Sequence, residues 1–369
     1  MRHAPATAAA WALLPLFAAV LLPAVAAAGP APAPAPERRV PIGLNGLPQA
    51  GNADSEKTAK DLGLNFLHEM ARWEEPAPGQ YPWPKTGEPD PWGKRLADLK
   101  ADGYTISVTL ANVHMDQKHM PAYLGGAPFD DPRVLERWAA FLTAFLERYG
   151  DSIDFLNIGN EVNNYFGKFP AEWPAYVKFM AVGRSVTKKL KPRIRVGTVL
   201  VEDGREKFWA SIAPLCDHLA VTYYVPCSMF GKMPAADALD PEKPGHFGRT
   251  LDAALALAKD KPVLVTEIGC ATHPSLDSSP AIQARFIAAL FDWLQARGGR
   301  VAGLSWLSER DWPYEATRKA LAGQLDAALL KHEPFMRFLT SLGLRDENGK
   351  DKPGYAAFKQ SIARYRAAD

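Results

Sequence analysis

Two glutamates that follow strand-like apolar segments are the residues of this sequence best suited to do chemistry. The segment 155–163 ends in an Asn160-Glu161 pair, and the segment 262–269 carries Glu267 near its end. Each carboxyl group follows an aliphatic run at the point where the chain leaves a strand. Because successive side chains of a strand point to opposite faces, Glu161 shares its face with small or polar residues. A carboxylate placed in this way faces a cleft.

A pair of carboxyl groups in one pocket can divide acid and base chemistry between them. Two negative charges at close range resist ionising together, so the pKa of one group rises and that group can act as an acid. A separation of about 5–5.5 Å suits double displacement at a sugar carbon, and about 6.5–9.5 Å suits a single displacement by water. The alternative is that each glutamate forms only a structural ion pair.

The elements that must position these glutamates alternate regularly between strand and helix. Strands are expected at 40–47, 64–70, 104–113, 155–163, 193–200, 219–225, 262–267 and 301–307. Helices are expected at 54–62, 91–101, 132–149, 173–190, 206–215, 250–259, 280–297, 327–342 and 355–365. This rhythm predicts a single-domain α/β fold, a (β/α)8 TIM barrel over 40–369. An open doubly wound sheet would need a glycine-rich phosphate loop after an early strand, and the sequence has none.

In a (β/α)8 barrel the C-terminal ends of all strands surround one pocket. Glu161 follows the fourth expected strand and Glu267 ends the seventh, so we expect the two to converge although three βα units separate them. Asn160-Glu161 and Glu267 in this order resemble the signature of the clan A glycoside hydrolases, such as families 5, 39 and 53. The resemblance implies that Glu161 is the acid/base, that Asn160 binds the sugar 2-hydroxyl, and that Glu267 is the nucleophile of a retaining enzyme.

Further motifs extend the resemblance over most of the chain. The run 73–83, which begins with Trp73, is similar to a Trp, Glu-Pro, Gly, Tyr, Trp run after strand two of the clan, and 343–353 resembles its closing segment. Tyr224 matches the strand-six tyrosine that hydrogen-bonds the nucleophile. Trp306 matches the strand-eight tryptophan that forms the floor of the sugar subsite.

Two positions depart from the clan pattern. His68 stands where the clan often has arginine, and Thr222 stands where it often has histidine. Arg72, further along the same strand, is the alternative residue that could take the place of that arginine. A neutral imidazole would tune the nucleophile less firmly than a permanent guanidinium charge. We expect His68 to line the site nevertheless.

Aromatic side chains suit carbohydrate binding because sugar rings present apolar C–H faces. Trp306, Trp312, Tyr224 and Trp73 are candidates, with ordinary packing as the alternative for each. His114 lies with Asp116 and His119 after the third strand. We interpret His114 as a sugar contact, because the spacing does not match a zinc motif.

Composition excludes several other functions. The 369 residues are 47% hydrophobic and 23% charged with a net charge of +2, which is typical of a globular protein without a polyanionic partner. This composition predicts no nucleic-acid partner. The resemblance implies a carbohydrate substrate and no cofactor, and we expect no metal and a monomer. The segment 303–307 lacks the final glycine of a serine-hydrolase elbow.

The N-terminus predicts export. Residues 1–28 have a short basic start, an Ala/Leu-rich stretch and small residues at a cleavage position, which is typical of a signal peptide. A membrane anchor is the alternative, but prolines interrupt the apolar run. Residues 29–39 form a Pro/Ala-rich spacer. We expect a periplasmic or secreted protein that keeps no membrane anchor after cleavage.

Three cysteines would lie in that oxidising compartment. We expect Cys227 and Cys270, which follow successive strands, to be neighbours that could form a disulfide bond, and Cys216 to be a buried thiol. The sequence as a whole predicts a retaining β-glycosidase acting on an oligo- or polysaccharide. A carbohydrate-binding envelope protein that keeps the barrel without catalysis is the main alternative.

Overall fold

The computed structural model describes residues 39–49, 52–85, 87–202, 204–231, 233–322 and 325–368. The expected signal peptide and nearly all of the expected spacer lie outside these residues. The chain from Arg38 to Asp369 forms one compact unit. Within the described part of the chain, no helix is both long and apolar enough to span a bilayer.

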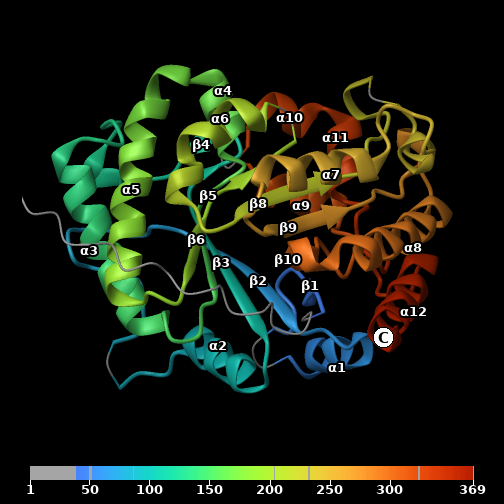
Figure 1. Ribbon diagram of the computed structural model, residues 1–369, viewed down its shortest axis with the longest axis horizontal. Coiled ribbons are helices and arrows are strands. Elements are labelled where there is room, and N and C mark those ends of the chain that lie inside the picture. Colours follow the sequence, from blue (N-terminus) through green and yellow to red (C-terminus); the bar gives the residue numbers. More distant parts are fainter. Residues whose placement is uncertain are drawn as a thin grey trace, which may run out of the picture. The chain divides into compact units, whose positions relative to one another are not determined.

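Parallel strands form a nearly closed barrel with helices around it, which confirms the expected TIM-barrel fold (Figure 1). The strands are β1 (Ile42–Leu44), β2 (Phe66–Ala71), β3 (Thr105–His114), β5 (Phe155–Asn160), β6 (Arg195–Gly197), β7 (Val199–Leu200), β8 (Leu219–Tyr224), β9 (Val263–Gly269) and β10 (Val301–Trp306). β4 (Gln117–Lys118) is a short antiparallel extension of β3.

The fifth expected strand is divided into β6 and β7 by Thr198. β6 pairs with β5 and β7 pairs with β8, so the two pieces together connect the two halves of the ring. The hydroxyl group of Thr198 donates to the carbonyl oxygen of Ile158 at 2.7 Å, which holds the break against β5.

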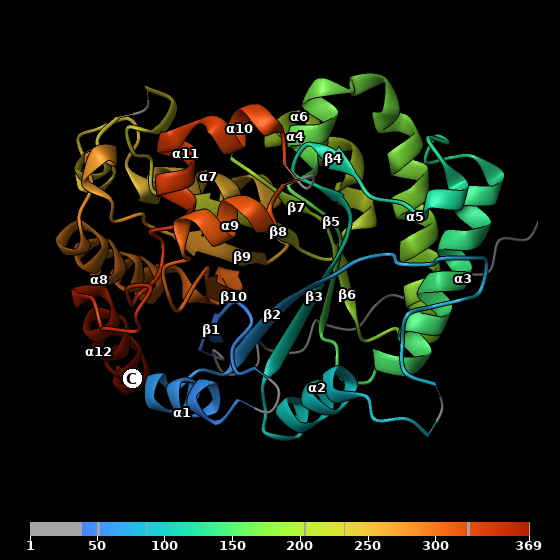
Figure 2. The same cartoon turned by 180° about the vertical axis from the view of Figure 1, so that it is seen from behind.

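The helices are α1 (Ala53–Leu62), α2 (Pro91–Ala101), α3 (Pro132–Tyr149), α4 (Val162–Lys168), α5 (Trp173–Leu190), α6 (Arg205–Ile212), α7 (Phe247–Ala258), α8 (Pro280–Arg297), α9 (Tyr314–Ala320), α10 (Ala327–Lys331), α11 (Glu333–Leu339) and α12 (Pro353–Ala367). Local signals set several of their ends. The Asn52 side chain caps α1 and Ser279 caps α8, and Gly63 ends α1 in the left-handed conformation. The last helix packs beside the first, where Tyr355 donates to Asp61 at 3.0 Å (Figure 2).

Two clusters of apolar side chains lie on the two faces of the barrel wall. A large cluster fills the space between the barrel and its helices, and a small one lies inside the barrel, where it consists of Phe66, Phe155, Val199, Ala220 and Leu264. Polar side chains occupy the barrel interior above this small cluster, among them Ser107, Thr109 and Asn157, none of which is exposed. The interior is therefore apolar at one level and hydrogen-bonded at the next.

The segment between β10 and α12 differs from expectation. The helix expected at 327–342 is two helices, because the His332 side chain accepts from the backbone N–H of Phe335 and starts α11 anew. Phe335 and Met336 of α11, together with Leu325 just before α10, pack against side chains that include Met115 and Met229. Met115 follows β3 and Met229 follows β8, so this segment covers part of the C-terminal mouth of the barrel.

Candidate active site

Glu161 lies directly after β5 in a strained backbone conformation. Its φ of 52° and ψ of 39° are left-handed, which is uncommon for a residue other than glycine, asparagine or aspartate. Gly159 precedes it with φ 79°, and a Cβ atom there would collide with the side chain of Val162. The chain thus turns sharply from strand into α4 and leaves the Glu161 side chain at the strand end, 7% exposed. Strain of this kind is concentrated at functional sites.

Two side chains of β8 form hydrogen bonds with the two glutamates. The hydroxyl group of Thr222 donates to Oε1 of Glu161 at 2.8 Å, and the hydroxyl group of Tyr224 donates to Oε2 of Glu267 at 2.5 Å. Thr222 is also the pairing partner of Glu267 across the β8–β9 ladder. Since one short strand contacts both carboxyl groups, they face each other across the same end of the barrel, as the sequence predicted.

Burial and mutual repulsion make this pair electrostatically unequal. Burial, together with the charge of Glu267, raises the pKa of Glu161 to about 8, although the hydrogen bond from Thr222 opposes the rise. Burial also raises the pKa of Glu267, but hydrogen bonds from both Tyr224 and Asn160 oppose it. With two donors on Glu267 and one on Glu161, the first proton to leave the pair comes from Glu267. Glu161 then remains a protonated acid near neutral pH.

Asn160 lies between Glu267 and His114. Its Nδ2 atom is 3.2 Å from Nδ1 of His114, and the two residues are partners across the β3–β5 ladder. Burial and the neighbouring His119 and Arg72 lower the pKa of His114 to about 4, so this imidazole is neutral at ordinary pH. The Oδ1 atom of Asn160 is buried and has no hydrogen-bond partner within the described residues. This acceptor is available to a ligand hydroxyl.

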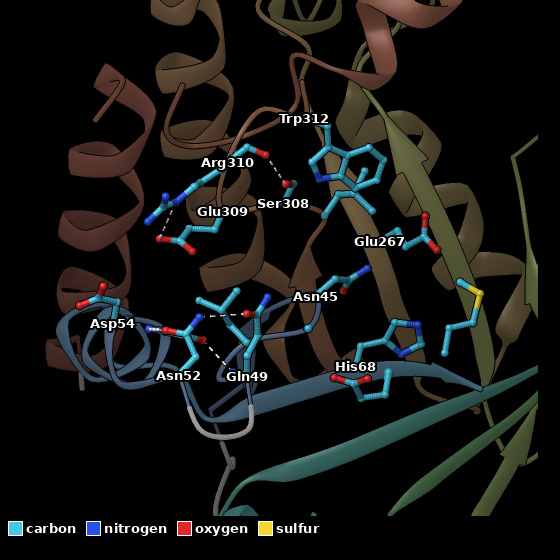
Figure 3. A pocket seen from close by; sticks show the side chains of 16 residues that line it. Asn45, Gln49, Asn52, Asp54, His68, Glu267, Ser308, Glu309, Arg310 and Trp312 are labelled. Atoms are coloured by element: carbon cyan, nitrogen blue, oxygen red, sulfur yellow. Dashed lines mark hydrogen bonds and ion pairs between the residues drawn. The ribbon is translucent and has the colours of Figure 1, made fainter. Parts of the chain in front are cut away.

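A pocket of about 740 Å³ opens beside Glu267 (Figure 3). His68, Asn45 and Glu267 lie at one end of it, and Asn52 and Asp54, at the start of α1, lie at the other. Its lining is rich in amide, carboxyl and hydroxyl groups, which suits a polar ligand such as a carbohydrate better than a lipid. His68, predicted to line the site, lies at its floor with 2% exposure.

The structure corrects the placement of two tryptophans. Trp306 has no exposed surface and points out of the barrel, where its ring lies 6.1 Å from Phe286 of α8 and 6.1 Å from Phe358 of α12. The reason is alternation: Trp306 pairs with Ile268, an outward-facing neighbour of Glu267. Trp73 is buried beside Trp138 and donates to Glu75 at 3.0 Å. Neither ring can contact a sugar in the pocket.

Other pocket residues were underestimated from the sequence. Trp312 is 36% exposed and lines the pocket, where it is the aromatic surface most accessible to a sugar ring. Asn45 follows β1 directly and hydrogen-bonds Ser305 of β10. An asparagine at the end of the first strand was a usable signal for this position, because every strand end of a barrel borders the pocket. Thr222, noted only as a departure, contacts Glu161.

The cysteine prediction is wrong in one respect. Cys216, Cys227 and Cys270 are all thiols, and no disulfide bond joins any two of them in the described part of the chain. Cys227 and Cys270 are near enough to interact electrostatically, but the Sγ of Cys270 donates to the carbonyl oxygen of Ala271 at 3.7 Å. Cys216 is a buried thiol, as expected.

An ion pair joins the cluster at the end of β3 to α4. Asp116 pairs with Lys168 at 2.7 Å, and the rings of His114 and His119 are 6.4 Å apart. Among the described residues, no three His, Cys, Asp or Glu side chains are grouped so that they could hold a metal ion.

Comparison with solved structures finds several proteins of similar fold. An exo-β-1,4-mannosidase from Opitutaceae bacterium strain TAV5 matches with a TM-score of 0.64 at 18% identity, over 88% of this chain and 59% of its own. A GH53 catalytic domain from Ignisphaera aggregans matches with a TM-score of 0.58 at 16% identity, over 87% of this chain and 95% of its own. GH5_18 from Streptomyces cattleya, in complex with Manβ1-4GlcNAc, matches with a TM-score of 0.63 at 18% identity, over 89% of this chain and 82% of its own.

The fold is similar to those of TIM-barrel glycoside hydrolases of families 5, 39 and 53, which are members of clan A. A family 39 glycoside hydrolase from Bacteroides cellulosilyticus WH2 also matches it, with a TM-score of 0.59 at 16% identity, over 89% of this chain and 64% of its own. No protein-family model and no curated protein matches the sequence. The chain spans 59% of the length of the mannosidase.

Proposed function

We propose that this protein is a retaining β-glycosidase that hydrolyses an oligo- or polysaccharide with Glu161 as acid/base and Glu267 as nucleophile. The observation that carries the proposal is the pair of buried glutamates held by one strand, with Thr222 on Glu161 and Tyr224 on Glu267. The fold shared with glycoside hydrolases supports the same reaction class.

The unequal pKa values support this division of roles. Glu161, with a pKa of about 8, enters the reaction protonated and gives its proton to the glycosidic oxygen as the bond to the leaving group breaks. Glu267, ionised and oriented by Tyr224, attacks the anomeric carbon and forms a glycosyl-enzyme. Glu161 is then a carboxylate, and it takes a proton from the water that releases the sugar with its original configuration. This chemistry needs no cofactor.

Asn160 and Trp312 are proposed to hold the sugar. The unpartnered Oδ1 of Asn160 accepts from a sugar hydroxyl, and the exposed ring of Trp312 packs against a sugar C–H face. The pocket lengthens from Glu267 towards α1, which supports a substrate of more than one residue.

Replacement of Glu267 tests the proposal. Glu267→Ala is expected to abolish hydrolysis of an aryl β-glycoside, chosen from a panel on which the native protein turns over, while leaving the circular dichroism spectrum unchanged. Added azide should restore turnover of this variant with formation of the α-glycosyl azide, whereas Glu161→Ala with azide should give the β-azide. Proton NMR of the first product of the native enzyme should show the β-anomer.

Glu147→Ala is the matched control, because it removes the same side chain from an exposed position of α3. We expect it to keep a near-native kcat. A near-native rate for Glu267→Ala would refute the assignment. Binding of oligosaccharides by calorimetry with no turnover on any panel member would favour the inert carbohydrate-binding alternative.

Export and a monomeric state are further parts of the proposal. The basic start and apolar stretch of residues 1–28 support removal of a signal peptide. N-terminal sequencing of protein recovered from the periplasm or medium should begin near residue 29, and an intact N-terminus in the cytoplasm would refute this part.

A further inference from the structure

A chain of hydrogen bonds crosses the barrel interior beneath the glutamate pair. Nε2 of His218 lies 2.7 Å from Oδ1 of Asn157, and Nδ2 of Asn157 donates to Oγ of Ser107 at 3.2 Å and to Oγ1 of Thr109 at 3.1 Å. Ser107 lies 3.1 Å from Nδ1 of His68. All five side chains are at most 2% exposed, so they satisfy one another rather than bulk water.

The direction of each donor in this chain follows from the chemistry of the groups. The Oδ1 atom of an amide can only accept, so His218 must donate from Nε2. Both amide protons of Asn157 are then used on Ser107 and Thr109. The hydroxyl proton of Ser107 remains, and Nδ1 of His68 is the acceptor that lies within reach of it. A nitrogen that accepts carries no proton, which leaves the proton of a neutral imidazole on Nε2.

We propose that this chain fixes His68 as the neutral Nε2–H tautomer, so that His68 presents an uncharged hydrogen-bond donor at the floor of the pocket beside Glu267. Its place in the reaction rests on the function proposed above, but the tautomer does not. Nε2 of His68 is buried and has no hydrogen-bond partner in the described part of the chain. Buried donors without a partner are rare, and this one borders the pocket that Glu267 also lines.

The surroundings keep this donor uncharged. Burial lowers the pKa of His68 to about 3. The groups that donate to Glu267, namely Tyr224 and Asn160, are also neutral. These neutral donors stabilise the Glu267 carboxylate less than a guanidinium bonded to it would. His68 thereby acts as a positioning group for the sugar or for Glu267, and its proton is not transferred.

Nitrogen NMR of the imidazoles reads the tautomer without any substrate. In a long-range ¹H–¹⁵N spectrum of uniformly labelled protein at pH 6.5, His68 is assigned by the signal that His68→Gln removes. We expect a protonated Nε2 and an unprotonated Nδ1. An Nδ1–H pattern would overturn the proposal, because it would mean that the Asn157 amide is turned over and that Ser107 donates to Asn157. An imidazolium pattern would overturn it as well.

A pair of hydroxyl deletions tests the cause. Ser107→Ala removes the hydroxyl group that donates to His68. We expect the nitrogen signals of His68 in this variant to move towards those of a mixture of tautomers. Thr109→Val deletes the other hydroxyl bonded to Asn157 and does not touch His68, so the Nε2–H pattern should persist. An unchanged pattern in Ser107→Ala would refute the hydrogen-bond chain as the cause. If Ser107→Ala does not fold, the native spectrum still decides the tautomer.

Two amide replacements of His68 test the role of the donor. The glutamine amide can place its NH2 group near the position of Nε2, whereas the shorter asparagine reaches only the position of Nδ1. We expect His68→Gln to keep kcat/KM within about tenfold and His68→Asn to lose roughly a hundredfold, which is the usual effect of deleting one active-site donor. If the two variants lost kcat/KM equally, or if His68→Asn kept the higher value, the proposed role of His68 as a donor would be refuted. If native protein shows no turnover, the proposed function fails while the NMR result stands independently.

Discussion

Replacing Glu161 by glutamine should stabilise the folded protein at neutral and alkaline pH. In the native protein burial and Glu267 raise the pKa of Glu161 from 4.5 to about 8, whereas the unfolded chain keeps an ordinary value. Between these two values the folded state binds a proton that the unfolded state does not. The free energy of unfolding therefore falls as pH rises, by about 1.4 kcal/mol per pH unit from this group. The free energy of unfolding begins to fall once the pH exceeds the pKa of Glu161 in the unfolded chain. It stops falling once the pH exceeds the pKa of Glu161 in the folded protein.

The size of the effect follows from that window. At pH 7 the destabilisation from Glu161 is on the order of 3 kcal/mol, and below pH 4 it vanishes. Glutamine has nearly the same shape, its Oε1 can still accept from Thr222, and it cannot ionise. For a compact unit of this size we expect the Tm of Glu161→Gln to exceed that of the native protein by roughly 4 °C at pH 7. The difference should disappear at pH 4.

Differential scanning calorimetry from pH 4 to 8 measures this directly and needs no substrate. Glu147→Gln, at an exposed position of α3, is the matched control and should change Tm equally little at every pH. The reasoning fails if Glu161→Gln has a Tm difference that does not depend on pH, or one that is largest in acid. Either result would mean that Glu161 is ionised in the folded protein and is not poised as an acid.

Three further substitutions probe the surroundings of the pair. Thr222→Val removes a hydrogen bond that lowers the pKa of Glu161, so the alkaline limb of kcat should move up by about one pH unit; Thr222→Ser should leave it in place. Gly159 has a left-handed conformation and no room for a Cβ, so Gly159→Ala should lower the free energy of unfolding, measured by urea titration, by about 3 kcal/mol. Gly167→Ala is the control and should leave this free energy unchanged, because a Cβ at that position meets open space. Trp312→Ala should raise KM several-fold without lowering Tm, and a lowered Tm with unchanged KM would contradict a sugar-binding role.

The architecture was readable from the sequence because it depends on local patterns. Regular alternation of strand and helix signals predicted the barrel, and positions at strand ends placed Glu161, Glu267 and Tyr224 around one mouth. A parallel barrel leaves little freedom here, since every strand must end on the same rim. The errors arose where a pattern was extended by resemblance alone: Trp306 follows the motif but faces outward, since it pairs with Ile268 and not with Glu267.

The sequence by itself therefore determined the fold class and the pair of carboxyl groups, because strand alternation and strand ends are encoded within a few residues. Tertiary structure decided what those groups can do. The raised pKa of Glu161, the exposure of Trp312 and the donor state of His68 depend on side chains brought together from strands far apart in the chain. Burial and hydrogen bonding are properties of that assembly, and no single segment of the sequence carries them.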